Sequence, residues 1–447
     1  MFAGKSTGMA VGHAVVWCAA ILGGALLSVP AGAQPDPGVH GGEAGGDPAA
    51  EPGDAQNAIR AGSIPIETRA ALFEFPKSER VSLQGAADAP GTVDFEDAPH
   101  GASPLTFGDG DFKITLGALL QFRYTASWSP GAPNADPTVG FQYRRLRPIL
   151  RGSGLDGAFR LFIQTEANGD GSVDLLDAWV SHQITDELRF RVGRFNLQYD
   201  RELITPAPYL PMLERSTLSN TLNVDAGNRV EGFEFRYQLP TQRLTVTFSE
   251  GLGVAGTSFN NSRSDWGVTG RYERMLIGDS FGLQSQTTAP RGEPRSLMFG
   301  FAVHQQHLNG LGERFNATTD LTYKHDGFNA TIALAAQVGE DRNGAMFGEP
   351  EHDWGMVLGT GYYVTEVLEP FARVELATTS DENHPDLGIV TAGLNCYILG
   401  QALKVSTDLS VAFNGIGPAF DRANDGFPVT PDGDNRYLWR AQIQMLF

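Results

Sequence analysis

The sequence predicts an all-β protein in which about 16 antiparallel strands form a transmembrane barrel. Apolar and polar residues alternate with a period of two from Phe107 to the end of the chain, which is typical of strands with one apolar face. No run of 18 apolar residues occurs beyond the first 35 positions, which excludes a helical membrane protein. The last strand carries Tyr437, Trp439 and Phe447 on its apolar face, as expected for the aromatic belts of a barrel wall.

The first 106 residues precede the barrel and differ from it in composition. Residues 1–33 read as a signal peptide: Lys5 precedes an apolar stretch, and Ala31-Gly32-Ala33 supplies a small-residue cleavage site, although an uncleaved anchor stays open. Residues 34–106 form an acidic segment rich in Pro, Gly and Ala. Between positions 34 and 100 it has twelve acidic residues against four basic ones, a composition that predicts disorder. The apolar patch 70–75 could dock on a partner or plug the barrel.

The barrel itself is assigned to residues 107–447. The first strand, Phe112 to Trp128, places Phe112, Ile114 and Leu116 on one face and Lys113 and Thr115 on the other. Further strands are expected near 141–152, 157–167, 174–184, 187–197, 229–239, 241–250, 264–275, 296–306, 314–325, 328–338, 354–364, 368–378, 388–399, 402–414 and 436–447. This makes sixteen strands, with fourteen or eighteen left open.

The links between strands should alternate between long loops and short turns. Six of seven expected turns are short, whereas residues 276–295 form a link of twenty residues where a turn is expected. A missed strand pair or a folded excursion would account for it. The longest link on the other side, 198–228, is too apolar to lie in water. We expect it to fold into the barrel as a third extracellular loop, with a lid or a contact between subunits as the alternative.

Basic residues on the polar face of the strands are the candidate functional residues. Strand parity directs one set of side chains into the lumen: Lys113, Arg123, Arg145, Arg147, Arg151, Arg160, Arg189, Arg191 and Arg236. A column of guanidinium groups suits oxyanions such as phosphate and carboxylate, so these residues predict an anion pathway. Equally, carboxylates such as Glu166 could pair with the arginines and brace the wall. Arg144 has the opposite parity and is expected at the membrane interface.

The inward loop should carry the constriction of the pore. The charged and aromatic residues expected to face it are Arg201, Glu202, Tyr209, Glu214 and Arg215. A lumen narrowed in this way implies a passive diffusion pore with a preference for anions.

The barrel resembles the phosphate-selective porin O and P family. The resemblance rests on Arg144-Arg145-Leu146-Arg147, Asp177-Ala178-Trp179-Val180, Arg191-Val192-Gly193-Arg194-Phe195, Arg201-Glu202-Leu203, Met212-Leu213-Glu214-Arg215-Ser216 and Gly393-Leu394-Asn395-Cys396-Tyr397. It implies a trimeric outer-membrane barrel of a Gram-negative bacterium, in contact with outer-membrane lipid, that passes phosphate or other anionic solutes. Family members gather lysines at the constriction, whereas Lys113, Lys324 and Lys404 are the lysines of this barrel.

Other classes of function find little support in the sequence. No Ser, His and acid constellation occurs at a spacing that indicates an enzyme, and His304 and His307 would point to opposite faces of a strand. We therefore expect no enzymatic activity, no cofactor, no metal site and no nucleic-acid partner. An unselective general porin and a structural or adhesion barrel plugged by its loops remain the alternatives.

Overall fold

The computed structural model describes most of the barrel and not the residues before it. The described ranges are 105–107, 112–130, 137–169, 171–222, 229–250, 266–308, 312–339, 351–378, 386–413 and 435–447, with positions 415, 416, 420 and 427. The predicted signal peptide and nearly all of the acidic segment lie outside them. In the described part of the chain, no helix has both the length and the apolar character needed to cross a membrane.

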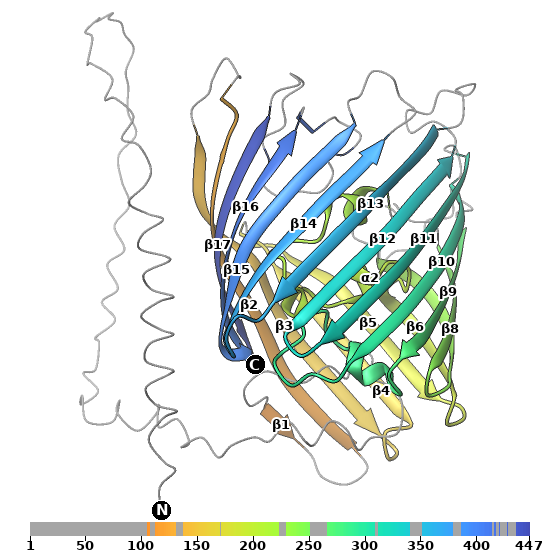
Figure 1. Cartoon of the computed structure of the whole chain (residues 1–447). Helices are drawn as coiled ribbons and strands as arrows, with labels where there is room; N and C mark the ends of the chain where they lie inside the picture. The colour runs from red at the N-terminus through yellow and green to blue at the C-terminus, as the bar shows by residue number, and fades with distance from the viewer. Residues whose placement is uncertain are drawn as a thin grey trace, which may run out of the picture. The chain divides into compact units, whose positions relative to one another are not determined.

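Sixteen of the described strands, β2 to β17, form a closed antiparallel barrel (Figure 1). Their bounds are β2 Phe112–Trp128, β3 Thr138–Gly154, β4 Phe159–Ala167, β5 Val173–Gln183, β6 Leu188–Asn196, β7 Arg229–Gln238, β8 Gln242–Ser249, β9 Trp266–Ile277, β10 Ser296–Leu308, β11 Gly312–His325, β12 Phe328–Gly339, β13 Glu351–Tyr362, β14 Leu368–Thr378, β15 Leu387–Gln401, β16 Leu403–Phe413 and β17 Arg436–Leu446. Each strand pairs with the next, and β17 pairs with β2 to close the ring. The predicted number and order of strands are confirmed.

A short additional strand, β1 (Leu105–Phe107), completes the seam of the barrel. The last strand, β17, pairs with β2 only from Leu119 to Trp128. Beyond its end, β1 pairs with β2 at Ile114 to Leu116. The amide of Phe447 donates to the carbonyl of Ala118 (3.0 Å) between these two pairings. The two ends of the barrel sequence therefore share one edge of β2, an arrangement that alternation alone did not reveal.

The two faces of the wall have opposite character, as the alternation predicts. On β6, Arg189 and Arg191 are 3% and 1% exposed, whereas Val192, the next residue along the strand, is 47% exposed. The same alternation gives exposed aromatic and aliphatic side chains on the outside of every long strand. Since charged side chains facing lipid near its midplane would cost several kcal/mol, an apolar exterior around a polar interior is the arrangement that a bilayer favours.

Two of the connections fold inward instead of projecting from the barrel. The link after β6 contains α2 (Arg201–Ile204), η5 (Ala207–Tyr209) and α3 (Thr217–Thr221). Nearly all of its described residues, 197–222, are buried, which confirms the inward third loop. The link between β9 and β10, residues 278–295, contains η6 (Phe281–Gln284) and no strand, so it is a folded excursion and not a missed strand pair.

Candidate functional site

The inner loop, residues 197–222, has its own local structure. Asp200 caps α2, since its Oδ2 accepts from the amides of Glu202 (3.1 Å) and Leu203 (3.3 Å). Ser216 caps α3 in the same way through the amide of Ser219 (3.0 Å). The hydroxyl of Ser219 donates in turn to Asp200, which joins the two short helices. These contacts satisfy amides at the starts of the two short helices.

Side chains from strands far apart on the wall hold the inner loop in place by donating to its backbone carbonyls. The contacts are Arg271 to Tyr199 (2.6 Å), Lys404 to Pro208 (3.0 Å), Asn395 to Pro211 (2.8 Å), Arg373 to Glu214 (2.7 Å) and Asn316 to Leu222 (2.9 Å). Because the donors come from β9, β11, β14, β15 and β16, the loop is fixed across the lumen from the wall where it begins.

The Glu214 cluster is the most tightly paired group of charges in the loop. The carboxylate of Glu214 is 4% exposed and contacts three arginines: Arg123 (2.7 Å), Arg144 and Arg145 (2.9 Å). Burial opposes ionisation of Glu214, but the three guanidinium groups outweigh it and hold the pKa of Glu214 well below its ordinary value. These three arginines, of which Arg123 and Arg145 were predicted to line the pore, therefore fasten the inner loop to β2 and β3.

The expectation that Arg144 lies at the membrane interface is wrong. The pairing of β2 with β3 shifts by one residue at this point: Gln121 faces Arg145 and Phe122 faces Tyr143, so Arg144 is the extra residue of a β-bulge. A bulge re-aims a side chain that strict alternation would place on the other face. As a result Arg144 points inward and pairs with Glu214.

The other predicted residues of the constriction also support the loop's own structure. Arg215 donates to the carbonyls of Glu202 (2.8 Å) and Thr205 (2.9 Å), and the carboxylate of Glu202 accepts from the amide (2.7 Å) and hydroxyl (2.6 Å) of Ser216. Tyr209 is buried, and its carbonyl accepts from the hydroxyl of Thr287 (3.2 Å). Arg215 and Glu202 thus hold the fold of the loop, while Tyr209 contacts a residue outside it.

The contact at Tyr209 joins the inner loop to the inward turn, residues 278–295, which enters from the opposite end of the barrel. Arg201 of the inner loop donates to the carbonyl of Gln284 in this turn. Lys324 on β11 holds the turn through the carbonyl of Leu283 (2.7 Å) and the carboxylate of Glu293 (2.9 Å). The two inward segments therefore meet inside the barrel.

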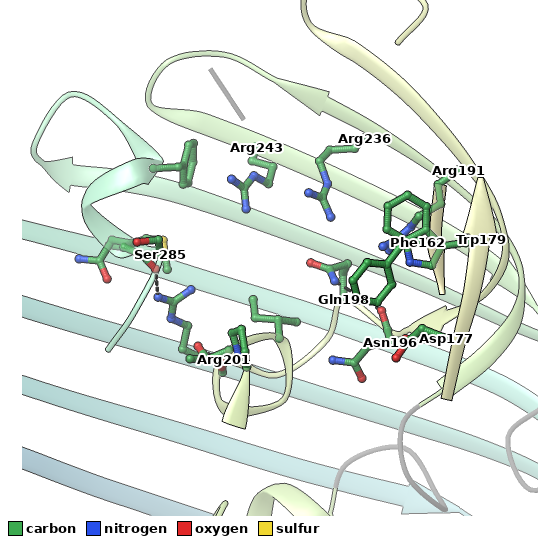
Figure 2. Close-up of a pocket in the computed structure, with 16 residues that line it drawn as sticks. Phe162, Asp177, Trp179, Arg191, Asn196, Gln198, Arg201, Arg236, Arg243 and Ser285 are labelled. Atoms are coloured by element: carbon green, nitrogen blue, oxygen red, sulfur yellow. Dashed lines mark hydrogen bonds between the residues drawn. The ribbon is translucent and has the colours of Figure 1, made fainter. Parts of the chain in front are cut away.

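A cavity of about 670 Å³, counting the part open to solvent, lies between these two segments and a wall whose lining residues come from β4 to β8 and from β10. Arginines line it from two sides: Arg191, Arg236 and Arg243 come from β6, β7 and β8, and Arg201 comes from the inner loop (Figure 2). Among the described residues, Asp177 is the acid that lines it, and this carboxylate pairs with Arg229 (3.0 Å). The lining is therefore strongly cationic.

The wall cluster around this cavity has more basic than acidic side chains. It consists of six arginines and three carboxylates: Arg189, Arg191, Arg201, Arg236, Arg243 and Arg271 with Glu234, Glu273 and Asp320. The difference of six and three leaves an excess of three positive charges among the described residues of the cluster. Asp200 lies near Arg271 and reduces the excess to two when it is ionised.

Gly193 allows the cavity wall to form at this point. Its φ is +131°, and a Cβ there would lie 2.3 Å from the carbonyl oxygen of Ala178 and 2.8 Å from the Cα of Trp179. Only glycine fits such a close approach of two backbones. The tight contact brings β6 against β5, where the guanidinium of Arg191 lies 5.4 Å from the ring centre of Trp179.

The remaining predicted pore residues lie outside this cavity. Lys113 is exposed near the start of β2, while Arg151 and Arg160 are half-buried on β3 and β4. Arg147 pairs through two contacts with Glu166 (2.9 and 3.1 Å), the bracing partner considered above. The structure thus separates residues that the sequence placed in a single column.

Several residues of the cavity were not among the predicted set. Arg243, which lines the cavity, and Arg271 of the surrounding wall cluster alternate with Leu244 and Tyr272, so the parity used for the other arginines could have found them. Phe281 and Gln284 had no such signal, because they lie in a link without periodicity whose inward fold depends on contacts with distant residues.

The fold is similar to those of solved outer-membrane proteins. The anion-selective porin from Comamonas acidovorans aligns with a TM-score of 0.56 and 13% identity over 75% of this chain and 100% of that porin. OmpT, an outer membrane protein of Vibrio cholerae, aligns with a TM-score of 0.51 and 10% identity over 76% of this chain and 100% of OmpT. No protein-family model and no curated protein matches the chain. The similarity to solved structures establishes that the chain has the barrel fold of these proteins.

Proposed function

We propose that this protein is a porin of the Gram-negative outer membrane through which small solutes diffuse passively, with a preference for anions such as phosphate or other oxyanions. The observation that carries the proposal is the cavity lined by Arg191, Arg201, Arg236 and Arg243, whose lining acid is already paired. An excess of fixed positive charge raises the local concentration of anions, and rings of like charge give pores their selectivity.

The surroundings of the barrel are part of the same proposal. The apolar exterior fits lipid of the outer membrane, where the porins of similar fold are found. A homotrimer is proposed from the family resemblance, and one of the similar structures is described as a trimer form of OmpT. The pore needs neither an enzymatic step nor a cofactor to act in this way. The 34–106 segment is proposed to be a disordered extension and 1–33 a cleaved signal.

The ion selectivity of the purified protein in a planar bilayer tests the proposal. Under a potassium chloride gradient, we expect a zero-current potential of the sign that chloride permeation produces. Arg194→Gln is a matched control for substitutions of the arginines that line the cavity. Arg194 also lies on β6, but it pairs with Glu231 (2.7 Å) and does not line the cavity. A potential near zero or of the opposite sign would contradict the anion preference and leave an unselective porin.

A loop-plugged barrel is a second candidate, favoured by the meeting of the inner loop with the inward turn at Tyr209 and Gln284. Absence of any open-channel conductance would support it. Replacing residues 279–294 with a short Asn-Gly turn would then restore conductance, since this replacement removes the inward turn while leaving β9 and β10 to pair.

A further inference from the structure

The lining of the cavity has two chemically different halves. The arginines supply one half, and the other consists of apolar side chains: Phe162, Trp179, Ile204, Pro206, Phe281 and Met298. The uncharged polar residues Asn196, Gln198, Thr205, Gln284 and Ser285 and the paired Asp177 complete the lining. A hydrated inorganic anion gains nothing from contact with aromatic rings. A ligand that buries apolar surface and presents a negative charge would use both halves.

Two of the four arginines that line the cavity, Arg191 and Arg243, stack on aromatic rings. The guanidinium of Arg243 lies 4.2 Å from the ring centre of Phe281, and that of Arg191 lies 4.1 Å from the ring centre of Phe195. A guanidinium stacked by its face on a ring keeps its N–H groups at the edge. Edge N–H groups are the donors that bind a carboxylate through two parallel hydrogen bonds.

Two of the four arginines that line the cavity, Arg243 and Arg201, retain donors that the described residues do not use. Arg243 donates from Nε to Gln238 and from Nη1 to Glu273, but its Nη2 has no hydrogen-bond partner among the described residues. The Nε of Arg201 is likewise without an acceptor there. Both residues are at most 7% exposed and line the cavity, and Figure 2 shows them approaching its space from the wall and from the inner loop. A buried donor without an acceptor is unfavourable, so an anionic ligand that supplies one gains affinity.

We propose that this cavity is a binding site for an organic carboxylate with a flat, apolar body, in which Arg243 and Arg201 hold the carboxylate while Phe281 and Trp179 contact the body. The proposal deepens the anion-pore function and rests on it for the route by which the ligand arrives. A ligand bound in this cavity occupies part of the path that anions take through the barrel. While it is bound, it reduces the chloride current.

The test compares three anions as blockers of the chloride current through the purified full-length protein in a planar bilayer: benzoate, acetate and inorganic phosphate. Acetate carries the carboxylate without a ring, and phosphate carries charge without an apolar body. We expect benzoate to halve the current at a concentration about ten-fold below that of either competitor, since a buried ring adds roughly that much affinity. Equal block by the three anions, or stronger block by phosphate, would overturn the proposed ligand class.

Two variants locate the site. Arg243→Gln removes the free donor, and Phe281→Ser removes a ring that lies on the inward turn and not in the barrel wall. Each should raise the half-blocking concentration of benzoate about ten-fold, because each removes one half of the recognition. Heat-dependent migration on a gel shows whether each variant folds. If Arg243→Gln does not fold, the Phe281→Ser variant decides the test. Arg194 lies outside the cavity, so the half-blocking concentration of benzoate for Arg194→Gln should equal that for wild type. Unchanged block in a folded Phe281→Ser variant would overturn the site.

Calorimetric titration of the detergent-solubilised protein with benzoate separates this inference from the pore function. Benzoate binding that is lost in Phe281→Ser, in a protein without conductance, would uphold the site and overturn the pore. Anion-selective conductance without benzoate binding would uphold the pore and overturn the site.

Discussion

The Glu214 cluster and the wall cluster are both rich in arginine, but the structure uses them differently. At Glu214, three arginines converge on a single carboxylate of the inner loop. In the wall cluster, six arginines share three carboxylates around a cavity, and four arginines line that cavity. Arginine content alone therefore does not identify an anion path. What distinguishes the two regions is whether an acid from an inward segment occupies the guanidinium groups.

The largest effect is expected from removing the carboxylate at the centre of the first cluster. Glu214→Gln leaves Arg123, Arg144 and Arg145 buried without their counter-charge, which should lower the free energy of unfolding by about 3–5 kcal/mol. Urea unfolding in detergent, followed by tryptophan fluorescence, measures the loss. Glu231→Gln is the control, because its pair with Arg194 is partly exposed. A difference of less than about 1 kcal/mol between the two variants would show that the Glu214 cluster is not the fastener of the loop.

Asp200 offers a pH-dependent test of how firmly the inner loop is held. Burial, assisted by nearby Glu202, raises the pKa of Asp200 from 3.8 to about 6. Because the folded state disfavours the ionised carboxylate, the resulting loss of stability is absent below about pH 4 and fully present above about pH 6. Asp200→Asn keeps a capping acceptor and removes the charge. The substitution should therefore raise the free energy of unfolding by as much as about 3 kcal/mol at pH 8 and leave it unchanged at pH 4. Equal unfolding free energies of the variant and wild type at both pH values would contradict this assignment.

A pair of matched substitutions tests the comparison directly through selectivity. Arg236→Gln removes a charge that lines the cavity, whereas Arg145→Gln removes one that Glu214 occupies. Loss of one charge beside the path lowers the local potential by about one kT, which favours potassium as much as it disfavours chloride. We therefore expect the chloride-to-potassium permeability ratio to fall roughly seven-fold for Arg236→Gln. Arg145→Gln should reduce stability and leave the ratio close to that of wild type. Zero-current potentials of the two folded variants decide the matter, and the reverse order would return Arg145 to the ion path.

Much of the fold was accessible from the sequence, and the reasons are physical. A period of two determines which side chains face lipid, so the strands and the inward direction of Arg189 and Arg191 followed from alternation. Arg144 was misplaced because a one-residue bulge reverses parity without changing composition. The partner of Arg145 could not be derived, because Glu214 lies 69 residues from Arg145 and reaches it only after the inner loop folds inward. Glu166, the partner of Arg147, was among the carboxylates that the sequence offered for bracing. The inward turn was equally inaccessible, since distant donors such as Lys324 hold it.

The smallest effect is expected at Arg147, one of the arginines that the sequence places in the lumen. Arg147 and Glu166 form a two-contact pair, but their side chains are 13% and 18% exposed, so water screens the pair more than it screens Glu214. Arg147→Gln should therefore lower the free energy of unfolding by about 1 kcal/mol or less. Because Arg147 does not line the cavity, the zero-current potential should also stay within error of wild type. A shift in that potential as large as that of Arg236→Gln, at unchanged stability, would mean that anions pass along β3 as well as along β6 to β9, and the distinction between a fastening cluster and a conducting cluster would no longer hold.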